Sequence, residues 1–145
     1  GNEIPVDYFV YATPPDQRWE DAWDAARNLL IETRDESADL GAKYVIVSAS
    51  TPQGVLGAEE GLKLLKEVYP AMRHLQWDLD MPNRRLAEFC RANDIPFLSL
   101  EPIFRDHVRD TGQQLHWQYD GHWNEAGNDL AGKQIAEFIH SLDSR

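Results

Sequence analysis

The chain of 145 residues has one cysteine, few basic residues and no long hydrophobic run. A single cysteine cannot form an internal disulfide bond, and Cys90 lies among apolar residues of a predicted helix, so we interpret it as a buried structural thiol. No apolar stretch approaches the roughly 18 residues of a membrane-spanning helix, so no membrane span is expected. Lys and Arg number 14 against 25 Asp and Glu, and the net charge of −11 argues against nucleic acid or an anionic membrane as a partner.

The beginning of the chain shows no signal peptide. Gly1-Asn2-Glu3 is typical of a trimmed chain end, so the compartment, cytoplasmic or exported, stays open. The length suits one domain spanning residues 1–145, large enough to bury about two thirds of its unfolded surface.

Hydrophobic periodicity predicts helices alternating with short strands. The predicted strands are residues 8–11, 44–47 and 95–100, the first of them the weakest, and residues 44–47 are expected to be buried on both faces. The predicted helices are one from the Asp16 cap to Gly41, residues 59–69, residues 83–93, one or two turns over 103–108, and a final helix capped by Asn124.

Strands separated by helices indicate a parallel sheet with right-handed crossovers. Two or three strands are few for such a fold, because the usual sheet holds about five or six. The sequence therefore predicts an α/β fold that contains only part of a doubly wound parallel sheet.

The segment Asp120-Gly121-His122-Trp123-Asn124 precedes the final helix. A carboxylate and an imidazole two residues apart on a loop are typical of the orienting half of an acyl-transfer triad, in which the histidine takes a proton from a hydroxyl and the carboxylate holds its tautomer. Two simpler interpretations stay open. Asp120 before a glycine could be a turn residue that bonds nearby backbone amides, and His122 could help to cap the helix.

From about Trp19 to its C-terminus, the chain resembles the C-terminal half of SGNH (GDSL-type) hydrolases, a family that includes acetylesterases and polysaccharide O-acetyltransferases. The matching segments occur in order: Ala22-Trp23, Val47-Ser48, Leu86-Ala87-Glu88-Phe89-Cys90, Asp94-Ile95-Pro96-Phe97-Leu98-Ser99-Leu100, and Asp120-Gly121-His122-Trp123-Asn124-Glu125-Ala126-Gly127. The resemblance implies a flavodoxin-like three-layer fold, Asp120 and His122 as catalytic residues, an ester of a small molecule or polysaccharide as substrate, and no metal or organic cofactor.

The chain departs from this family in its nucleophile and oxyanion hole. The family's serine lies in a Gly-Asp-Ser segment, and this chain contains no Gly-Asp pair. Gly127-Asn128-Asp129 lies inside the final helix and Asn93-Asp94 ends a helix, so neither matches the family's Gly-x-Asn-Asp segment; Asn128 stands where the family often has histidine. We therefore expect the chain to be the C-terminal part of a larger domain, nearly inactive alone, and to form a homo-oligomer or to pair with the missing N-terminal half.

Ser48 and Ser50 lie at the end of the predicted strand at 44–47, where open α/β sheets place their sites. Neither has the glycine-flanked elbow that exposes a nucleophilic serine, so we interpret both as loop hydroxyls that make turn bonds.

Two alternative functions remain. His116, Asp120 and His122 form an H-x3-D-x-H string that could bind iron or zinc, although its spacing is not that of a zincin. A non-catalytic carbohydrate-binding or assembly module would use exposed aromatic rings, for which the candidates are Trp19, Trp23, Trp117, Tyr119 and Trp123. Trp123 is expected to be core or scaffold.

Overall fold

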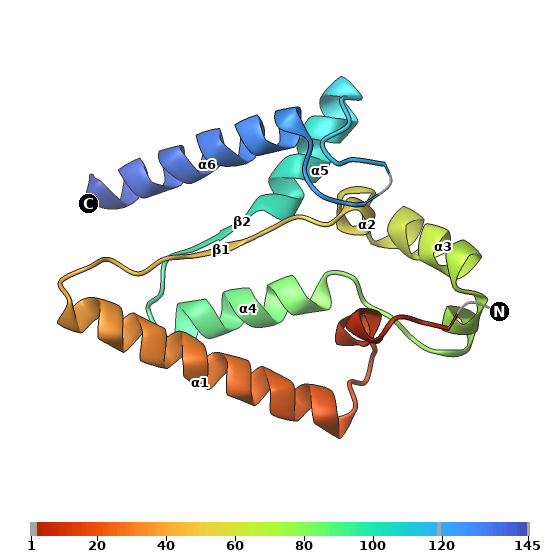
Figure 1. Ribbon diagram of the computed structural model, residues 1–145, viewed down its shortest axis with the longest axis horizontal. Helices are drawn as coiled ribbons and strands as arrows, with labels where there is room; N and C mark the ends of the chain where they lie inside the picture. The colour runs from red at the N-terminus through yellow and green to blue at the C-terminus, as the bar shows by residue number, and fades with distance from the viewer. Residues whose placement is uncertain (1–2, 119, 145) are drawn as a thin grey trace. The chain divides into compact units, whose positions relative to one another are not determined.

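The computed structural model describes residues 3–118 and 120–144, so Gly1 and Asn2 of the predicted trimmed end, together with Tyr119 and Arg145, lie outside the described residues (Figure 1). The elements in chain order are η1 (Val6–Tyr11), α1 (Gln17–Asp39), β1 (Ile46–Ser48), α2 (Pro52–Val55), α3 (Ala58–Val68), η2 (Pro70–His74), α4 (Met81–Ala92), β2 (Phe97–Ser99), α5 (Leu100–Thr111) and α6 (Glu125–Asp143), where η marks a 3₁₀ helix.

The fold is a mostly helical α/β arrangement with one small parallel sheet, in which β1 pairs with β2. The backbone N–H of Ile46 donates to the carbonyl of Pro96 over 3.0 Å. The α/β class predicted from the sequence is confirmed, and the doubly wound, three-layer arrangement stays a prediction. Both strands are shorter than predicted, and β1 is less enclosed, because Ile46 is buried whereas Val47 and Ser48 are half-buried.

The ends of the two longest helices follow the sequence closely. Asp16 caps α1, and its Oδ1 accepts the backbone N–H of Trp19 over 3.1 Å. Asn124 caps α6, and its Oδ1 accepts the N–H of Gly127 over 2.9 Å. These side chains satisfy N–H groups that have no partner inside the helix.

The strand predicted at residues 8–11 is wrong. This segment belongs to the 3₁₀ helix η1, in which the ring of Tyr8 packs 5.4 Å from Tyr69 and the ring of Phe9 packs 5.5 Å from Trp77. A run of four apolar residues does not distinguish a strand from a short buried helix, and ring packing decides here. Residues 8–11 therefore provide no strand edge through which another chain could pair.

The helix predicted over residues 103–108 extends further in both directions, from Leu100 to Thr111 as α5. Pro102 lies in the first turn of α5. Proline fits the first turn of a helix, because the N–H that it lacks would have no partner there.

The described chain divides into two compact units. The first comprises Gly1–Ile46 and Leu62–Phe97, and its buried apolar residues form two clusters: Leu65, Met72, Trp77 and Leu79 in one, and Ile46, Cys90 and Ile95 in the other. Cys90 is fully buried, and burial raises the pKa of its thiol, as expected for a structural cysteine.

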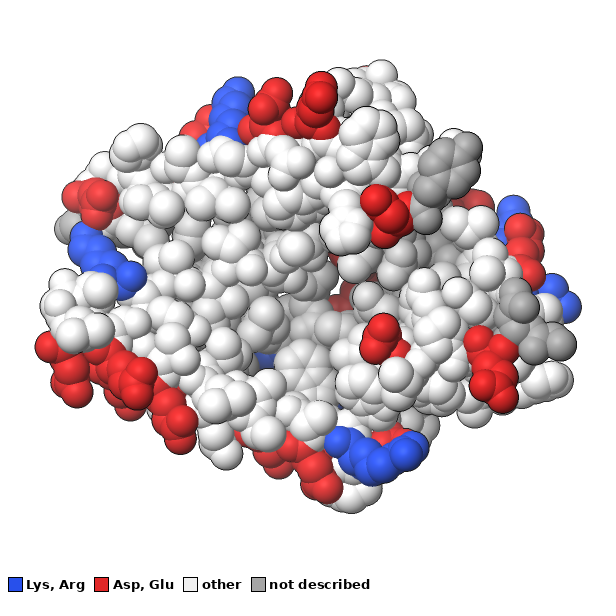
Figure 2. Space-filling model, in the orientation of Figure 1, with Lys and Arg blue, Asp and Glu red and all other residues white. Residues whose placement is uncertain are grey.

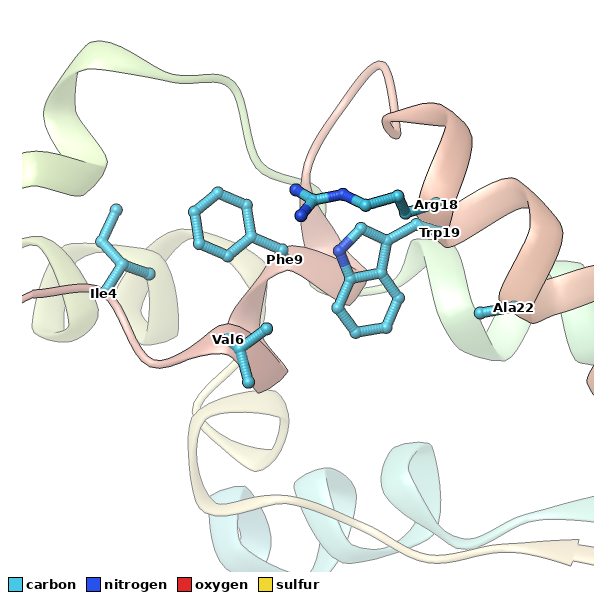
Figure 3. A pocket seen from close by; sticks show the side chains of 6 residues that line it. All are labelled: Ile4, Val6, Phe9, Arg18, Trp19 and Ala22. Carbon is cyan, nitrogen blue, oxygen red and sulfur yellow. The ribbon is translucent and has the colours of Figure 1, made fainter.

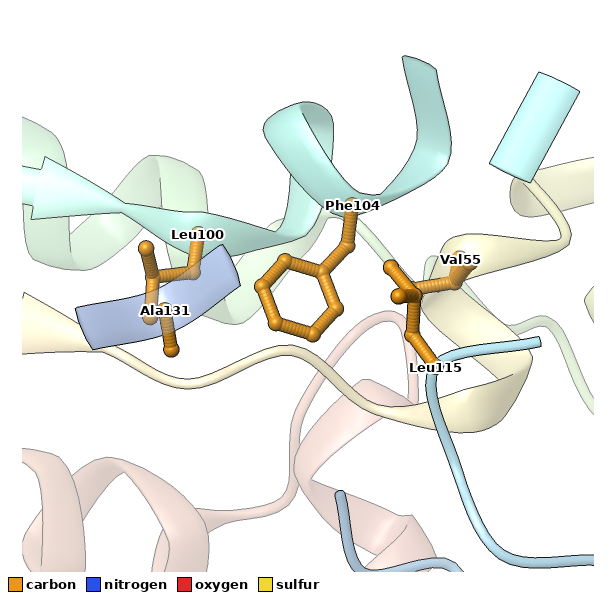
Figure 4. Packing of buried hydrophobic residues seen from close by; sticks show 5 residues of the cluster. All are labelled: Val55, Leu100, Phe104, Leu115 and Ala131. Carbon is orange, nitrogen blue, oxygen red and sulfur yellow. The ribbon is translucent and has the colours of Figure 1, made fainter. Parts of the chain in front are cut away.

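The second unit comprises Val47–Gly61 and Leu98–Arg145. Its core is a cluster of Val55, Leu100, Phe104, Leu115 and Ala131, in which the Phe104 ring extends from α5 between the other side chains (Figure 4). Leu100 and Phe104 are fully buried.

Acidic side chains gather along α1 in the first unit (Figure 2). Its surface carries Asp21, Asp24, Glu32, Asp35, Glu36 and Asp39, all exposed. Among the described residues, no helix combines the length and the apolar character that crossing a bilayer requires.

Candidate functional site

The loop between α5 and α6 forms a short hairpin within the second unit. The backbone N–H of Trp117 donates to the carbonyl of His122 over 2.8 Å, and that of Asn124 donates to Leu115 over 3.0 Å. At the tip, the N–H of Gly121 donates to the carbonyl of Trp117 over 3.2 Å. Gly121 has φ 73°, a left-handed conformation that favours glycine, so the Asp120-Gly121 pair suits this turn.

Asp120 and His122 lie together at the tip of the hairpin. Asp120 Oδ1 accepts the backbone N–H of His122 over 3.0 Å and lies 3.5 Å from His122 Nδ1. The bond to the backbone amide is the one expected of a turn aspartate, so that interpretation of Asp120 is confirmed. The same oxygen also faces the nitrogen that an orienting carboxylate would contact, which leaves Nε2 as the nitrogen available to a reacting group.

Both side chains are open to solvent, with 83% of the His122 side chain and 59% of the Asp120 side chain exposed. A carboxylate and an imidazole in water attract each other only weakly, because water screens their charges. The residues of this chain therefore align the pair without enclosing it. Helix capping is performed by Asn124 and not by His122.

A second polar cluster is centred on Ser50, which contacts two residues of the hairpin. Trp123 Nε1–H donates to Ser50 Oγ over 3.0 Å, and His116 Nε2 lies 3.3 Å from the same oxygen. Ser50 is 7% exposed. Its bonds thus reach residues 66 and 73 positions away, and the interpretation of Ser50 as a hydroxyl that makes local turn bonds is wrong.

His116 and Trp123 face each other across the hairpin as an isolated antiparallel bridge. Both rings lie against Phe104 of the core, with centroid distances of 5.9 Å for His116 and 5.3 Å for Trp123. Trp123 is therefore part of the scaffold, as predicted. Burial lowers the pKa of the His116 imidazole, which outweighs the opposite effect of its hydrogen bond to the Ser50 carbonyl, so His116 is neutral at pH 7.

His122 and its neighbour Gly121 border a pocket of about 430 Å³. Its lining combines small residues, an indole and polar groups: Ala49, Ser50, Gly121, His122, Trp123 and Asn128. The Asn128 amide is directed to the carbonyls of Trp123 and Asn124, over 3.3 and 3.0 Å, so it supports the start of α6. The pocket places His122 and Ser50 beside the same space.

Gly127 sets how closely α6 approaches the hairpin. A Cβ at this position would collide with the Leu115 carbonyl oxygen and would lie 3.1 Å from Trp123 Cβ. Only glycine permits this packing without a shift of the backbone. The first turn of α6 and the base of the hairpin are therefore fitted to each other.

The loop that carries Ser50 is fixed by a buried network with α5. Glu101 is 4% exposed and pairs with Arg105 over 3.3 Å, and Thr51 Oγ1 donates to Glu101 over 3.4 Å. Arg105 also donates twice to the Gly54 carbonyl, over 3.0 and 2.8 Å. A buried carboxylate that is bonded to a guanidinium and a hydroxyl holds the loop in place.

The metal alternative receives no support from the described residues. Within them, no group of three His, Cys, Asp or Glu side chains is placed to hold a metal ion. His116 is directed to Ser50, while Asp120 and His122 lie at the exposed tip. The H-x3-D-x-H string is therefore split between two environments.

A second pocket, of about 340 Å³, lies in the first unit and is lined by Ile4, Val6, Phe9, Arg18, Trp19 and Ala22 (Figure 3). Trp19 borders this pocket, whereas Trp23 is half-buried with the Arg85 guanidinium 4.9 Å from its ring. Of the other predicted aromatic candidates, Trp117 is 55% exposed and Tyr119 lies outside the described residues.

Comparison with models of known families, with curated proteins and with solved structures finds no match to this chain.

Proposed function

We propose that the chain is the part of an SGNH-type ester hydrolase or O-acyltransferase that carries the Asp-His half of its triad. In this proposal His122 is the general base and Asp120 its orienting carboxylate, and both serve a serine outside residues 1–145. The observation that carries the proposal is the position of Asp120 Oδ1, 3.5 Å from His122 Nδ1, so that Nε2 is the ring nitrogen left for a reacting group, on a residue that borders a pocket.

The chemistry follows from these two side chains. His122 Nε2 would take the proton of the serine hydroxyl as that oxygen attacks an ester carbonyl, and would then return it to the leaving alcohol. Asp120 would hold the imidazole with its proton on Nδ1 and stabilise the imidazolium that forms. Neither step requires a metal or an organic cofactor.

The exposure of the pair fits the same proposal. Triads work in sites from which water is largely excluded, whereas 83% of the His122 side chain is open here. The segment that supplies the serine would also cover His122. A chain without that segment is then expected to be nearly inert toward p-nitrophenyl acetate, because removing the nucleophile of a triad costs about as much rate as removing the whole triad.

Kinetics of the longer polypeptide that supplies the serine test the proposal. His122→Ala and Asp120→Asn should each lower kcat/KM for an acetyl ester by about 10⁴-fold, the loss seen for an equivalent Asp→Asn change in a serine protease. The matched control is His140→Ala, which removes an exposed imidazole from α6 away from the pocket. Equal rates for His122→Ala and His140→Ala would refute the proposed base, and strong His122-dependent turnover by residues 1–145 alone would refute the external serine.

A second candidate function is carbohydrate binding without catalysis. Trp117 supports it, because this residue is 55% exposed on the same hairpin as Asp120 and His122. An exposed indole can stack on a sugar ring. Isothermal titration with acetylated oligosaccharides distinguishes the two functions: a binding module loses affinity in Trp117→Ala, and the longer polypeptide shows no hydrolysis.

A further inference from the structure

Ser50 contacts both sides of the hairpin that carries Asp120 and His122. Its Oγ lies 3.0 Å from Trp123 Nε1 and 3.3 Å from His116 Nε2, and these two residues form the bridge at the base of the hairpin. We propose that Ser50 is the positioning residue of the Asp120–His122 pair and acts through Trp123. This inference rests on the proposed function, because it concerns the alignment of that pair.

The directions of the hydrogen bonds follow from the donors available. An indole N–H can only donate, so Ser50 Oγ accepts it. When His116 carries its proton on Nδ1, its Nε2 accepts the remaining hydroxyl proton of Ser50. In the other tautomer, His116 Nε2–H donates to the Ser50 carbonyl, 3.5 Å away. His116 is bound to Ser50 in either tautomer, and burial keeps its ring neutral.

The effect on His122 passes through its neighbour in the chain. Trp123 directly follows His122, and its ring is fixed on one side by Phe104 and at its N–H by Ser50. The carbonyl of His122 is fixed in turn by the N–H of Trp117. Because the His122 imidazole itself is exposed, its distance from Asp120 depends on this backbone and not on packing around the ring.

The same contacts argue against Ser50 as the nucleophile of the pocket. One lone pair of Ser50 Oγ is engaged by the Trp123 N–H, and the residue is 7% exposed. A nucleophilic serine needs an exposed oxygen at a sharp turn, whereas this oxygen is enclosed between two rings. A buried hydroxyl with two fixed partners is suited to holding backbone in place.

The tautomer of His122 in the ¹⁵N-labelled chain, read from imidazole ¹⁵N shifts at a pH where the ring is neutral, tests the inference. The wild type should carry its proton mainly on Nδ1, and Asp120→Asn should abolish this preference. Ser50→Ala should lower the ratio of Nδ1–H to Nε2–H by about threefold or more, the size of one ordinary hydrogen bond. Ser50→Thr, which keeps a hydroxyl, should restore it. Ser37→Ala is the control, because it removes an exposed hydroxyl from α1.

Trp123→Phe keeps an aromatic ring and removes only the N–H donor, so it should reproduce Ser50→Ala and gives a second result if Ser50→Ala does not fold. An unchanged ratio in either folded variant would overturn the inference and leave the proposed function intact. A wild type without any preference for Nδ1–H would instead refute the Asp120–His122 pair, and with it the proposed function.

Discussion

Replacing Gly127 by alanine should destabilise the protein, although alanine usually stabilises a helix. Gly127 lies in the first turn of α6, and an added Cβ would collide with the Leu115 carbonyl oxygen. Gly132 lies on the same helix, and a Cβ there would meet nothing within 4 Å. The pair of substitutions therefore separates helix propensity from the close approach of α6 to the hairpin.

The magnitudes follow from two opposing effects. Alanine is favoured over glycine inside a helix by about 0.8–1.0 kcal/mol, so Gly132→Ala should stabilise the protein by up to about 1 kcal/mol. Gly127→Ala has the same propensity gain but must displace backbone, and overpacking costs about 1–3 kcal/mol. The free energies of unfolding of the two variants should thus differ by about 1–3 kcal/mol, with Gly127→Ala the less stable.

Urea unfolding followed by far-UV circular dichroism measures this difference, provided that the m-values of the variants agree. Retention of the Trp123 indole resonance in Gly132→Ala, and its shift in Gly127→Ala, would locate the effect at the hairpin. If Gly127→Ala stabilises the protein as much as Gly132→Ala does, the fit between α6 and the Leu115 carbonyl is refuted.

Three further predictions concern the same unit. Burial lowers the pKa of His116, so folding favours the neutral imidazole. This contribution to stability is present above pH 6.5 and is lost as the pH falls below it. Denaturation between pH 7.5 and 5 should therefore show a steeper loss of unfolding free energy in the wild type than in His116→Phe. Asn124→Ala removes the cap of α6 and should cost about 1 kcal/mol of unfolding free energy, whereas Asn124→Asp should retain most of it. Ser99 Oγ is buried without a hydrogen-bond partner among the described residues, so Ser99→Ala should leave the melting temperature unchanged or raise it, and a large decrease would show that the hydroxyl has a partner.

The helix ends could be predicted from the sequence because the signals are local. Asp16 and Asn124 bond N–H groups three residues further along, which periodicity and capping rules capture. The segment at residues 8–11 could not, because its conformation depends on Tyr69 and Trp77, which lie far away in the sequence. The strands predicted at 44–47 and 95–100 overlap β1 and β2 but are too long, because each of these strands comprises only three residues.

The sequence likewise predicts one part of the candidate site and not the other. Asp120 and His122 are two residues apart, so a short motif is enough to bring them together. The partners of Ser50 are 66 and 73 residues away, and no periodic signal links them. The position of Ser50 after a strand was the available clue, because the carboxyl end of a strand is where such a sheet places its site. A hydroxyl in that position could equally make turn bonds, because its bonding partners are set by the folding of residues far along the chain.

Mapping the serine that serves His122 tests the proposed function most directly. The longer polypeptide is treated with a fluorophosphonate ester, which modifies activated serines, and the adduct is located by mass spectrometry. We predict an adduct on a serine outside residues 1–145, formed much more slowly in His122→Ala and at the normal rate in His140→Ala. An adduct on Ser48 or Ser50, or a rate that His122→Ala leaves unchanged, would contradict the assignment of His122 as the base of an acyl-transfer triad.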